Sequence, residues 1–166
     1  MPNKSSDIID ILTEQHSQLD ELFEKLEDAT APNSTFTKLA NMLVAHAAAE
    51  EKVFYPAVMA KETTDMLYES VEEHLAAKRV LADLVAGGLK PENFKAKMSV
   101  LKEDISHHAH EEEEKELFPK VRSLFEKSFR EELGQKYQQA FDDAMQAHNA
   151  VPVDTATAAP LPALSK

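Results

Sequence analysis

The chain has 166 residues, a formal net charge of −12 and no cysteine. Its length is that of one domain with a sizeable core. Scarce glycine and abundant Ala, Leu, Glu and Lys favour helices. The acidic balance argues against partners such as nucleic acid or an anionic membrane surface, and no apolar run is long enough to span a bilayer. Without cysteine the chain has neither disulfides nor thiolate ligands. The N-terminus lacks a signal-peptide pattern, so we expect a cytoplasmic protein.

Apolar residues recur at steps of three and four along five stretches, which is the period of amphipathic helices. Short polar or proline-containing loops separate the first four stretches, and this favours an up-down-up-down arrangement. We therefore predict an all-α protein, a four-helix bundle with an additional C-terminal helix, as one domain over residues 1–147. The remainder, 148–166, is rich in small residues and proline, and we expect a flexible tail. The helices are expected at about 7–28, 35–60, 63–86, 91–119 and 128–146.

Each of the first four stretches carries a histidine among the apolar residues of its buried side. The second stretch shows this best, because His46 and Glu50 continue the apolar series formed by Leu39, Met42 and Leu43. Residues four apart lie above one another on a helix, so this pair presents an imidazole and a carboxylate to the same point. The histidines of the four stretches are His16, His46, His74 and His108.

The fourth stretch offers three pairs with this spacing: His107–Glu111, His108–Glu112 and His110–Glu114. The apolar series Leu101, Ile105 leads to His108 and then to Glu112, which favours the second pair. We interpret Glu111, Glu113 and Glu114 as a solvated face.

Four histidines and two glutamates at one level of a bundle core predict a dinuclear metal site. Each metal takes two imidazoles, and Glu50 and Glu112 are shared as bridges. Buried carboxylates are costly unless they are paired or bound to a metal. With only nitrogen and oxygen donors, the site suits iron, manganese, zinc or copper. The predicted ligands are His16, His46, Glu50, His74, His108 and Glu112.

Taken in order, a histidine, His-x3-Glu-Glu with aromatic-Pro, a histidine, and His-x3-Glu with Phe-Pro resemble the haemerythrin-like HHE cation-binding family. The resemblance implies a non-haem di-iron centre with an oxo or hydroxo bridge, held by the six residues above. A crystal of such a protein can also contain zinc or another divalent metal. The oxygen carriers of the family have a fifth histidine one turn from the third-helix ligand. Here Ser70 and Lys78 stand one turn either side of His74, which favours sensing, iron handling or redox chemistry over oxygen carriage.

Two classes of function follow from this resemblance. The leading hypothesis is a di-iron protein that binds or senses O₂, NO or peroxide, with no dedicated organic substrate and no enzymatic activity assigned. The alternative is an iron-handling or metal-stabilised interaction bundle, whose acidic surface or tail contacts a partner. The sequence leaves the physiological metal open.

Overall fold

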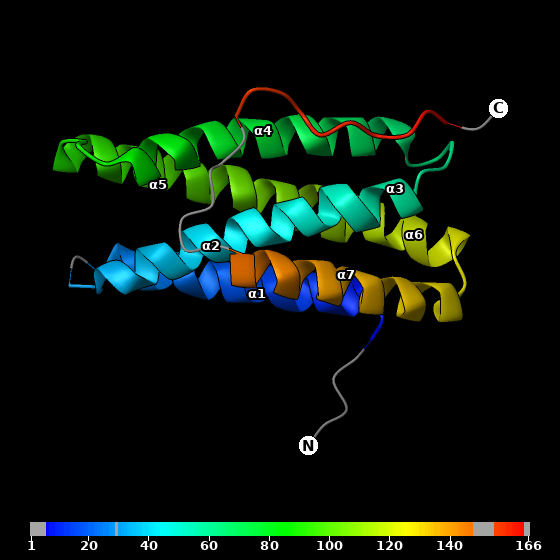
Figure 1. Cartoon of the computed structure of the whole chain (residues 1–166). Helices are drawn as coiled ribbons and strands as arrows, with labels where there is room; N and C mark the ends of the chain where they lie inside the picture. The colour runs from blue at the N-terminus through cyan, green and yellow to red at the C-terminus, as the bar shows by residue number, and fades with distance from the viewer. Residues whose placement is uncertain (1–5, 29, 148–154, 165–166) are drawn as a thin grey trace, which may run out of the picture.

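The computed structural model describes residues 6–28, 30–147 and 155–164, and within these ranges all regular structure is helical. Four long helical rods alternate in direction along one bundle, and a fifth packs on its side (Figure 1). This confirms the predicted all-α bundle with an additional C-terminal helix. The rods begin with α1 (Ile8–Glu27), α2 (Asn33–Ala49), α4 (Thr64–Ala86) and α5 (Pro91–Ser106), and the fifth is α7 (Lys127–Ala147).

Two of the rods contain a π-helical segment, in which hydrogen bonds span five residues instead of four. The second rod continues from α2 through η1 (Glu50–Phe54) into α3 (Tyr55–Ala57), and the fourth from α5 through η2 (His107–Leu117) into α6 (Phe118–Leu124). In both rods a proline follows the π-helical segment. The fourth rod stays helical past Pro119 to Leu124, although the sequence predicts a kink or an end at this proline.

The π-helical hydrogen bonds at the two prolines are equivalent. The Tyr55 N–H, just before Pro56, donates to the carbonyl of Glu50. The Phe118 N–H, just before Pro119, donates to the carbonyl of Glu113. A proline ring clashes with the carbonyl four residues before it, and the wider turn gives that carbonyl more room.

The fifth helix is fastened to the start of the first. The Asp7 side chain caps α1 by accepting a hydrogen bond of 3.0 Å from the Ile9 N–H, and it also accepts one of 3.0 Å from Arg130 on α7. Gly134 of α7 lies against the backbone of Ser6, where a Cβ would come within 1.9 Å of the Ser6 carbonyl oxygen. Only glycine permits this approach, so α7 packs directly on α1 and α2.

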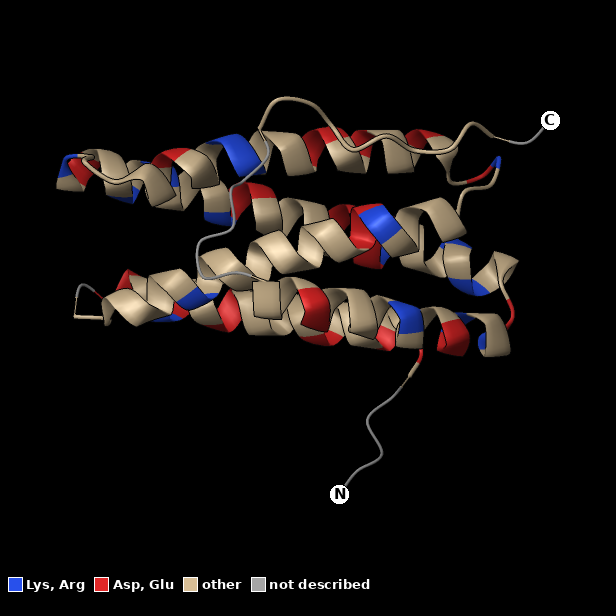
Figure 2. Ribbon diagram, viewed as in Figure 1, with Lys and Arg blue, Asp and Glu red and all other residues tan. Residues whose placement is uncertain are grey.

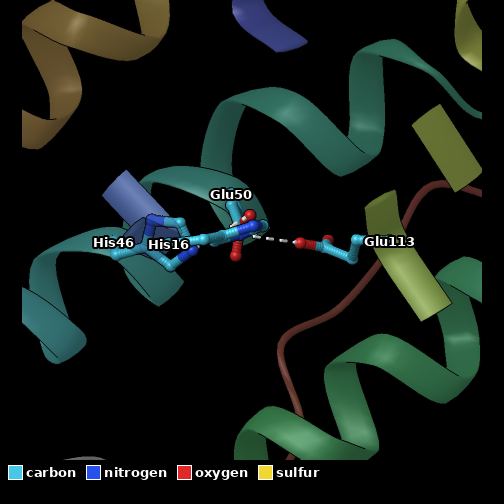
Figure 3. Close-up of side chains that lie close together, drawn as sticks. All are labelled: His16, His46, Glu50 and Glu113. Carbon is cyan, nitrogen blue, oxygen red and sulfur yellow. Dashed lines mark ion pairs between the residues drawn. The ribbon is translucent and has the colours of Figure 1, made fainter. Parts of the chain in front are cut away.

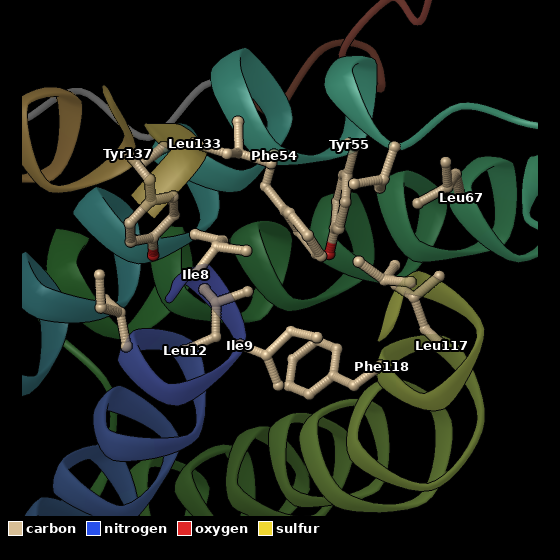
Figure 4. Packing of buried hydrophobic residues seen from close by; sticks show 14 of the residues in the cluster. Ile8, Ile9, Leu12, Phe54, Tyr55, Leu67, Leu117, Phe118, Leu133 and Tyr137 are labelled. Atoms are coloured by element: carbon tan, nitrogen blue, oxygen red, sulfur yellow. The ribbon is translucent and has the colours of Figure 1, made fainter. Parts of the chain in front are cut away.

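The apolar core is divided into two clusters. One joins the start of α1 to α3, the start of α4, α6 and α7, and includes Leu12, Phe54 and Leu117 (Figure 4). The other fills the opposite part of the bundle around Leu22, Leu43 and Leu81. Along all four rods, the predicted histidines lie in sequence between the residues of the two clusters. A polar layer is therefore enclosed by apolar residues on both sides.

Acidic and basic residues are distributed along the helices (Figure 2). Within the described part of the chain, no helix is both long and apolar enough to cross a membrane. Of the predicted tail, residues 148–154 and 165–166 lie outside the described residues. Residues 155–164 contain no helix or strand, and Ala158 and Leu161 pack against the first apolar cluster.

Candidate metal centre

The Glu50 carboxylate lies between two imidazoles from different helices. Its Oε1 is 3.3 Å from Nε2 of His46, and its Oε2 is 3.3 Å from Nε2 of His74. All three side chains are buried, and Glu50 has no exposed surface. The sequence prediction that these three residues face inward agrees with the structure.

A second carboxylate makes the same arrangement with the other two histidines. Glu113 Oε2 is 3.3 Å from Nε2 of His16, and its Oε1 is 3.7 Å from Nε2 of His108. Figure 3 shows Glu113 facing His16, His46 and Glu50 from the opposite helix. The Nε2 atoms of His74 and His108 are only 3.1 Å apart. Four imidazoles and two carboxylates thus converge at one level of the bundle.

The second inward carboxylate belongs to Glu113, whereas the sequence analysis assigned this position to Glu112 and placed Glu113 on the solvated face. Glu113 is fully buried, while the Glu112 side chain retains 27 % of its exposure and contacts His107 and the outer nitrogen of His108. The cause is η2, because in a π-helix residues five apart share a face. Of the two alternative pairs, His107 is exposed, and His110 pairs with Glu114 on the rim of the centre.

Outer carboxylates hold three of the four imidazoles by their Nδ1 atoms. His16 donates to Glu114 at 2.7 Å, His74 to Glu51 at 2.9 Å, and His108 to Glu73. A carboxylate only accepts, so it keeps the proton on Nδ1 and leaves the Nε2 lone pair directed inward. Lys78 binds both oxygens of Glu51 at 2.6 and 2.9 Å.

The fourth imidazole is held by neutral groups. His46 Nδ1 donates to the side-chain oxygen of Gln15 at 2.8 Å, and the Tyr137 hydroxyl donates to the same oxygen at 2.7 Å. Tyr137 lies on α7, so the additional helix helps to orient a residue of the centre. Neither Gln15 nor Tyr137 follows the His-Glu spacing, and the sequence analysis did not identify them.

The hydroxyl of Tyr55 lies inside the centre. It donates to Glu113 Oε1 at 2.8 Å and is 3.2 and 3.3 Å from Nε2 of His74 and His108. Burial, together with the negative charges of Glu113 and Glu50, raises its pKa well above the usual value. Tyr55 therefore brings a neutral oxygen to the side of the centre formed by His74 and His108. Tyr68, by contrast, is 46 % exposed.

Opposing effects shift the pKa values of the inward groups in the metal-free protein. Burial lowers the pKa of His16, but hydrogen bonds and charges from Glu113 and Glu114 outweigh it and raise the pKa to about 9. Burial and the positive charge of His16 lower the pKa of His46 well below its usual value. Burial and the charge of Glu113 raise the pKa of Glu50. Burial also raises the pKa of Glu113, but the charges of His108 and His16 outweigh it, and the pKa is lowered.

The donor atoms of this centre fit a metal. Among the described residues, three buried side-chain atoms lack a hydrogen-bond partner: His16 Nε2, Glu50 Oε1 and Glu113 Oε2. Such atoms are rare in folded proteins and call for a ligand. Together with His46 they form a group whose donor atoms lie within 4.8 Å of one another, and Glu50, His74 and His108 form a second such group. Glu50 belongs to both groups, as a bridging carboxylate would.

A sequence signal for Glu113 exists, but it is counted from the proline. Residues 50–56 read Glu-Glu-Lys-Val-Phe-Tyr-Pro and residues 113–119 read Glu-Glu-Lys-Glu-Leu-Phe-Pro. Aligned in this way, Glu113 corresponds to Glu50 and Glu114 to Glu51. Counting forward from the histidine instead leads to Glu112, because His108 lies five residues before Glu113 and His46 four before Glu50.

Comparison with known proteins agrees with this geometry. The chain is 29 % identical over 119 residues to a protein of Nostoc sp. (strain PCC 7120 / SAG 25.82 / UTEX 2576) named DNA nickase. This match covers 70 % of the chain but only 34 % of the Nostoc protein, so the chain spans about a third of that relative. No solved structure matches the chain. Residues 7–121 match the Hemerythrin HHE cation binding domain, and the chain therefore belongs to this family.

Proposed function

We propose that the chain holds two iron ions, and that the resulting non-haem centre binds or senses O₂, NO or peroxide. The observation that carries this proposal is the position of two buried carboxylates, each of which lies between two imidazoles. Glu50 directs one oxygen to His46 and the other to His74, and Glu113 directs one to His16 and the other to His108. Each metal would receive two imidazole nitrogens and two carboxylate oxygens.

Iron suits this set of donors, since the centre has only nitrogen and oxygen ligands and the family takes cations. When bound, a di-iron centre supplies electrons to small oxidants. Four protein donors leave positions free on a six-coordinate ion. No fifth histidine fills them, because His74 is flanked one turn away by Ser70 and by Lys78, whose ammonium is bound to Glu51.

A small apolar cavity beside the centre supports the proposal that the ligand is a diatomic molecule. It has a volume of about 20 Å³ and lies among the four inward histidines and aliphatic residues that include Leu43, Leu81 and Ile105. This is about the space that one small molecule needs. Its apolar lining favours a neutral ligand such as O₂ or NO over an ion, and it keeps bulk water away from the Nε2 atoms.

The absorption spectrum of aerobically purified protein, with metal analysis, tests the proposal. We expect two irons per chain and visible bands that change with azide or peroxide. Glu113→Gln is the matched control, since it keeps the shape of the side chain but removes one bridge. A colourless protein loaded with zinc would overturn the proposal and favour the alternative, an iron-handling or metal-stabilised interaction bundle.

DNA nicking is not part of this proposal. The chain spans only about a third of the relative that bears that name, and its net charge of −12 opposes binding to phosphate backbones.

A further inference from the structure

A second cavity reaches the centre from the other side and differs from the apolar one in chemistry. It has a volume of about 180 Å³ and lies between α4 and η2. The carboxylates of Glu69, Glu112 and Glu116 line it, and the buried residues Ser70 and Glu113 are in its wall. A water molecule takes about 30 Å³ in the liquid, so the cavity has room for a cation with part of its hydration shell.

This cavity leads to a buried donor atom as well as to surface acids. Glu113 is fully buried, and its Oε2 has no hydrogen-bond partner. Its Oε1 accepts from Tyr55, whose hydroxyl is 3.2 Å from His74 Nε2. Glu113 thus lines the cavity and also belongs to the group of donor atoms that it forms with His16, His46 and Glu50.

The apolar cavity and the acidic cavity suit different ligands. A divalent cation that crosses an apolar cavity loses its hydration without compensation, which is costly. A cavity with carboxylate walls concentrates cations and replaces lost water with oxygen donors. Glu69 and Glu116 are exposed, and Glu112 lies deeper, next to Glu113. The carboxylates therefore run from the surface to the buried ligand.

One carboxylate of the acidic cavity has no counterpart in the other repeated segment. In the repeated segment before each proline, Glu116 corresponds to Val53. Val53 is half-buried and packs against the first apolar cluster. The repeat does not require a carboxylate at this position.

We propose that the acidic cavity between α4 and η2 is the route by which a divalent cation enters and leaves the centre. This inference rests on the cation site of the proposed function and adds how that site is filled. It assigns Glu69 and Glu116 the role of attracting the cation, without binding it in the final state.

Stopped-flow loading of the metal-free protein with cobalt(II) chloride at low salt tests the route. We expect the double variant Glu69→Gln/Glu116→Gln to load roughly 5- to 10-fold more slowly, since local charge acts mainly on association rates. The final metal content should stay unchanged, because neither carboxylate binds the cation in the final state. The matched control is Glu24→Gln/Glu92→Gln, which removes the same charge from exposed positions away from the cavity.

Equal loading rates in the cavity variant and the control variant would overturn the route. A lower final cobalt content in the cavity variant would also overturn it, because Glu69 or Glu116 would then be ligands. If the unmodified chain bound no cobalt at all, the cation site itself would be refuted, and that outcome is distinct from the other two.

Discussion

The two halves of the centre reach the same arrangement from different spacings. His46 and Glu50 are four residues apart at the end of the α-helical part of the second rod, whereas His108 and Glu113 are five apart inside η2. One additional residue in an α-helix normally turns every later side chain by about 100°. The π-helical turn absorbs that residue, so Glu113 faces inward as Glu50 does.

Beyond Glu50 and Glu113, the two halves repeat each other. Glu51 holds the Nδ1 of His74 and Glu114 holds the Nδ1 of His16, so each half orients a histidine of a neighbouring helix. The lesson is that the aromatic-Pro end fixes the register of these motifs. The histidine end tolerates a change of one residue.

The equivalence of the two halves is tested most directly at the two adjacent glutamates, Glu112 and Glu113. We predict that Glu113→Gln loses at least one metal and weakens binding more than about 100-fold, because orienting groups alone contribute 10- to 100-fold and Glu113 touches both pairs of imidazoles. Glu112→Gln should keep two metals per chain. Metal analysis combined with titration measures both variants. The opposite ranking would restore Glu112 as the bridge.

These two glutamates also mark the limit of what the sequence alone could predict. The histidines and Glu50 follow the 3.6-residue period of an α-helix, so the apolar pattern suffices to turn them inward. That period does not hold through residues 107–117, so counting from His108 turns Glu112 inward and Glu113 outward, whereas Glu113 is the buried residue. Gln15 and Tyr137 depend on contacts between distant rods. Such contacts leave no periodic signal.

Removing the metal tests how much the bound ions contribute to the thermal stability of the bundle. We predict that the metal-free protein folds but melts earlier by roughly 10 °C, because a ligand at 1,000 times its Kd contributes about 4 kcal/mol, and each kcal/mol moves the Tm of a domain this size by about 2–4 °C. The two apolar clusters remain intact and keep the bundle folded. Calorimetry with and without chelator measures the shift. In Glu113→Gln the shift should shrink, and equal Tm values in the unmodified protein would refute the linkage.

The two metal sites should also differ in their response to pH. We call the metal held by His16 and His46 the first metal, and the metal held by His74 and His108 the second. In the metal-free protein the pKa of His16 is raised to about 9 and that of His46 is lowered, so we expect the first metal to displace one proton near neutral pH. The pKa values of His74 and His108 are both raised, because the hydrogen bonds of His74 to Glu50 and Glu51 and the charge of Glu113 beside His108 outweigh burial. We therefore expect the metal held by His74 and His108 to displace more protons. Each proton released makes affinity rise about tenfold per pH unit.

The stability of the metal-free protein depends on pH in the opposite direction to its metal affinity. A raised histidine pKa stabilises the metal-free protein below the unfolded value of about 6.5, and this contribution is lost as pH rises through about 9. We therefore expect the increase in Tm on adding zinc to be larger at pH 8.5 than at pH 6.5. Calorimetry in two buffers of different ionisation enthalpy counts the protons released. Equal counts for the two metals would contradict the difference between the halves.

The smallest expected effect concerns the one inward position where the repeated segments differ in chemistry. Tyr55 places a hydroxyl among His74, His108 and Glu113, whereas its counterpart Phe118 stacks on the ring of His16 at 5.9 Å. A metal held by those imidazoles would lie next to the hydroxyl oxygen, because this oxygen is within 3.3 Å of both Nε2 atoms. That oxygen then either binds the metal or keeps Glu113 oriented by its hydrogen bond.

If the hydroxyl oxygen binds that metal, Tyr55→Phe should weaken the metal held by His74 and His108 and spare the metal held by His16 and His46. We expect a loss of roughly 5- to 10-fold, near the lower end of what a hydrogen bond to a charged group contributes. A zinc titration followed by the imidazole NMR signals of His46 and His74 separates the two sites within one sample. The first site serves as the internal control, because Tyr55 makes no hydrogen bond to His16 or His46 among the described contacts. An equal loss at both sites would show that the hydroxyl acts on the whole centre through Glu113, and the asymmetry between the two halves would then lie elsewhere.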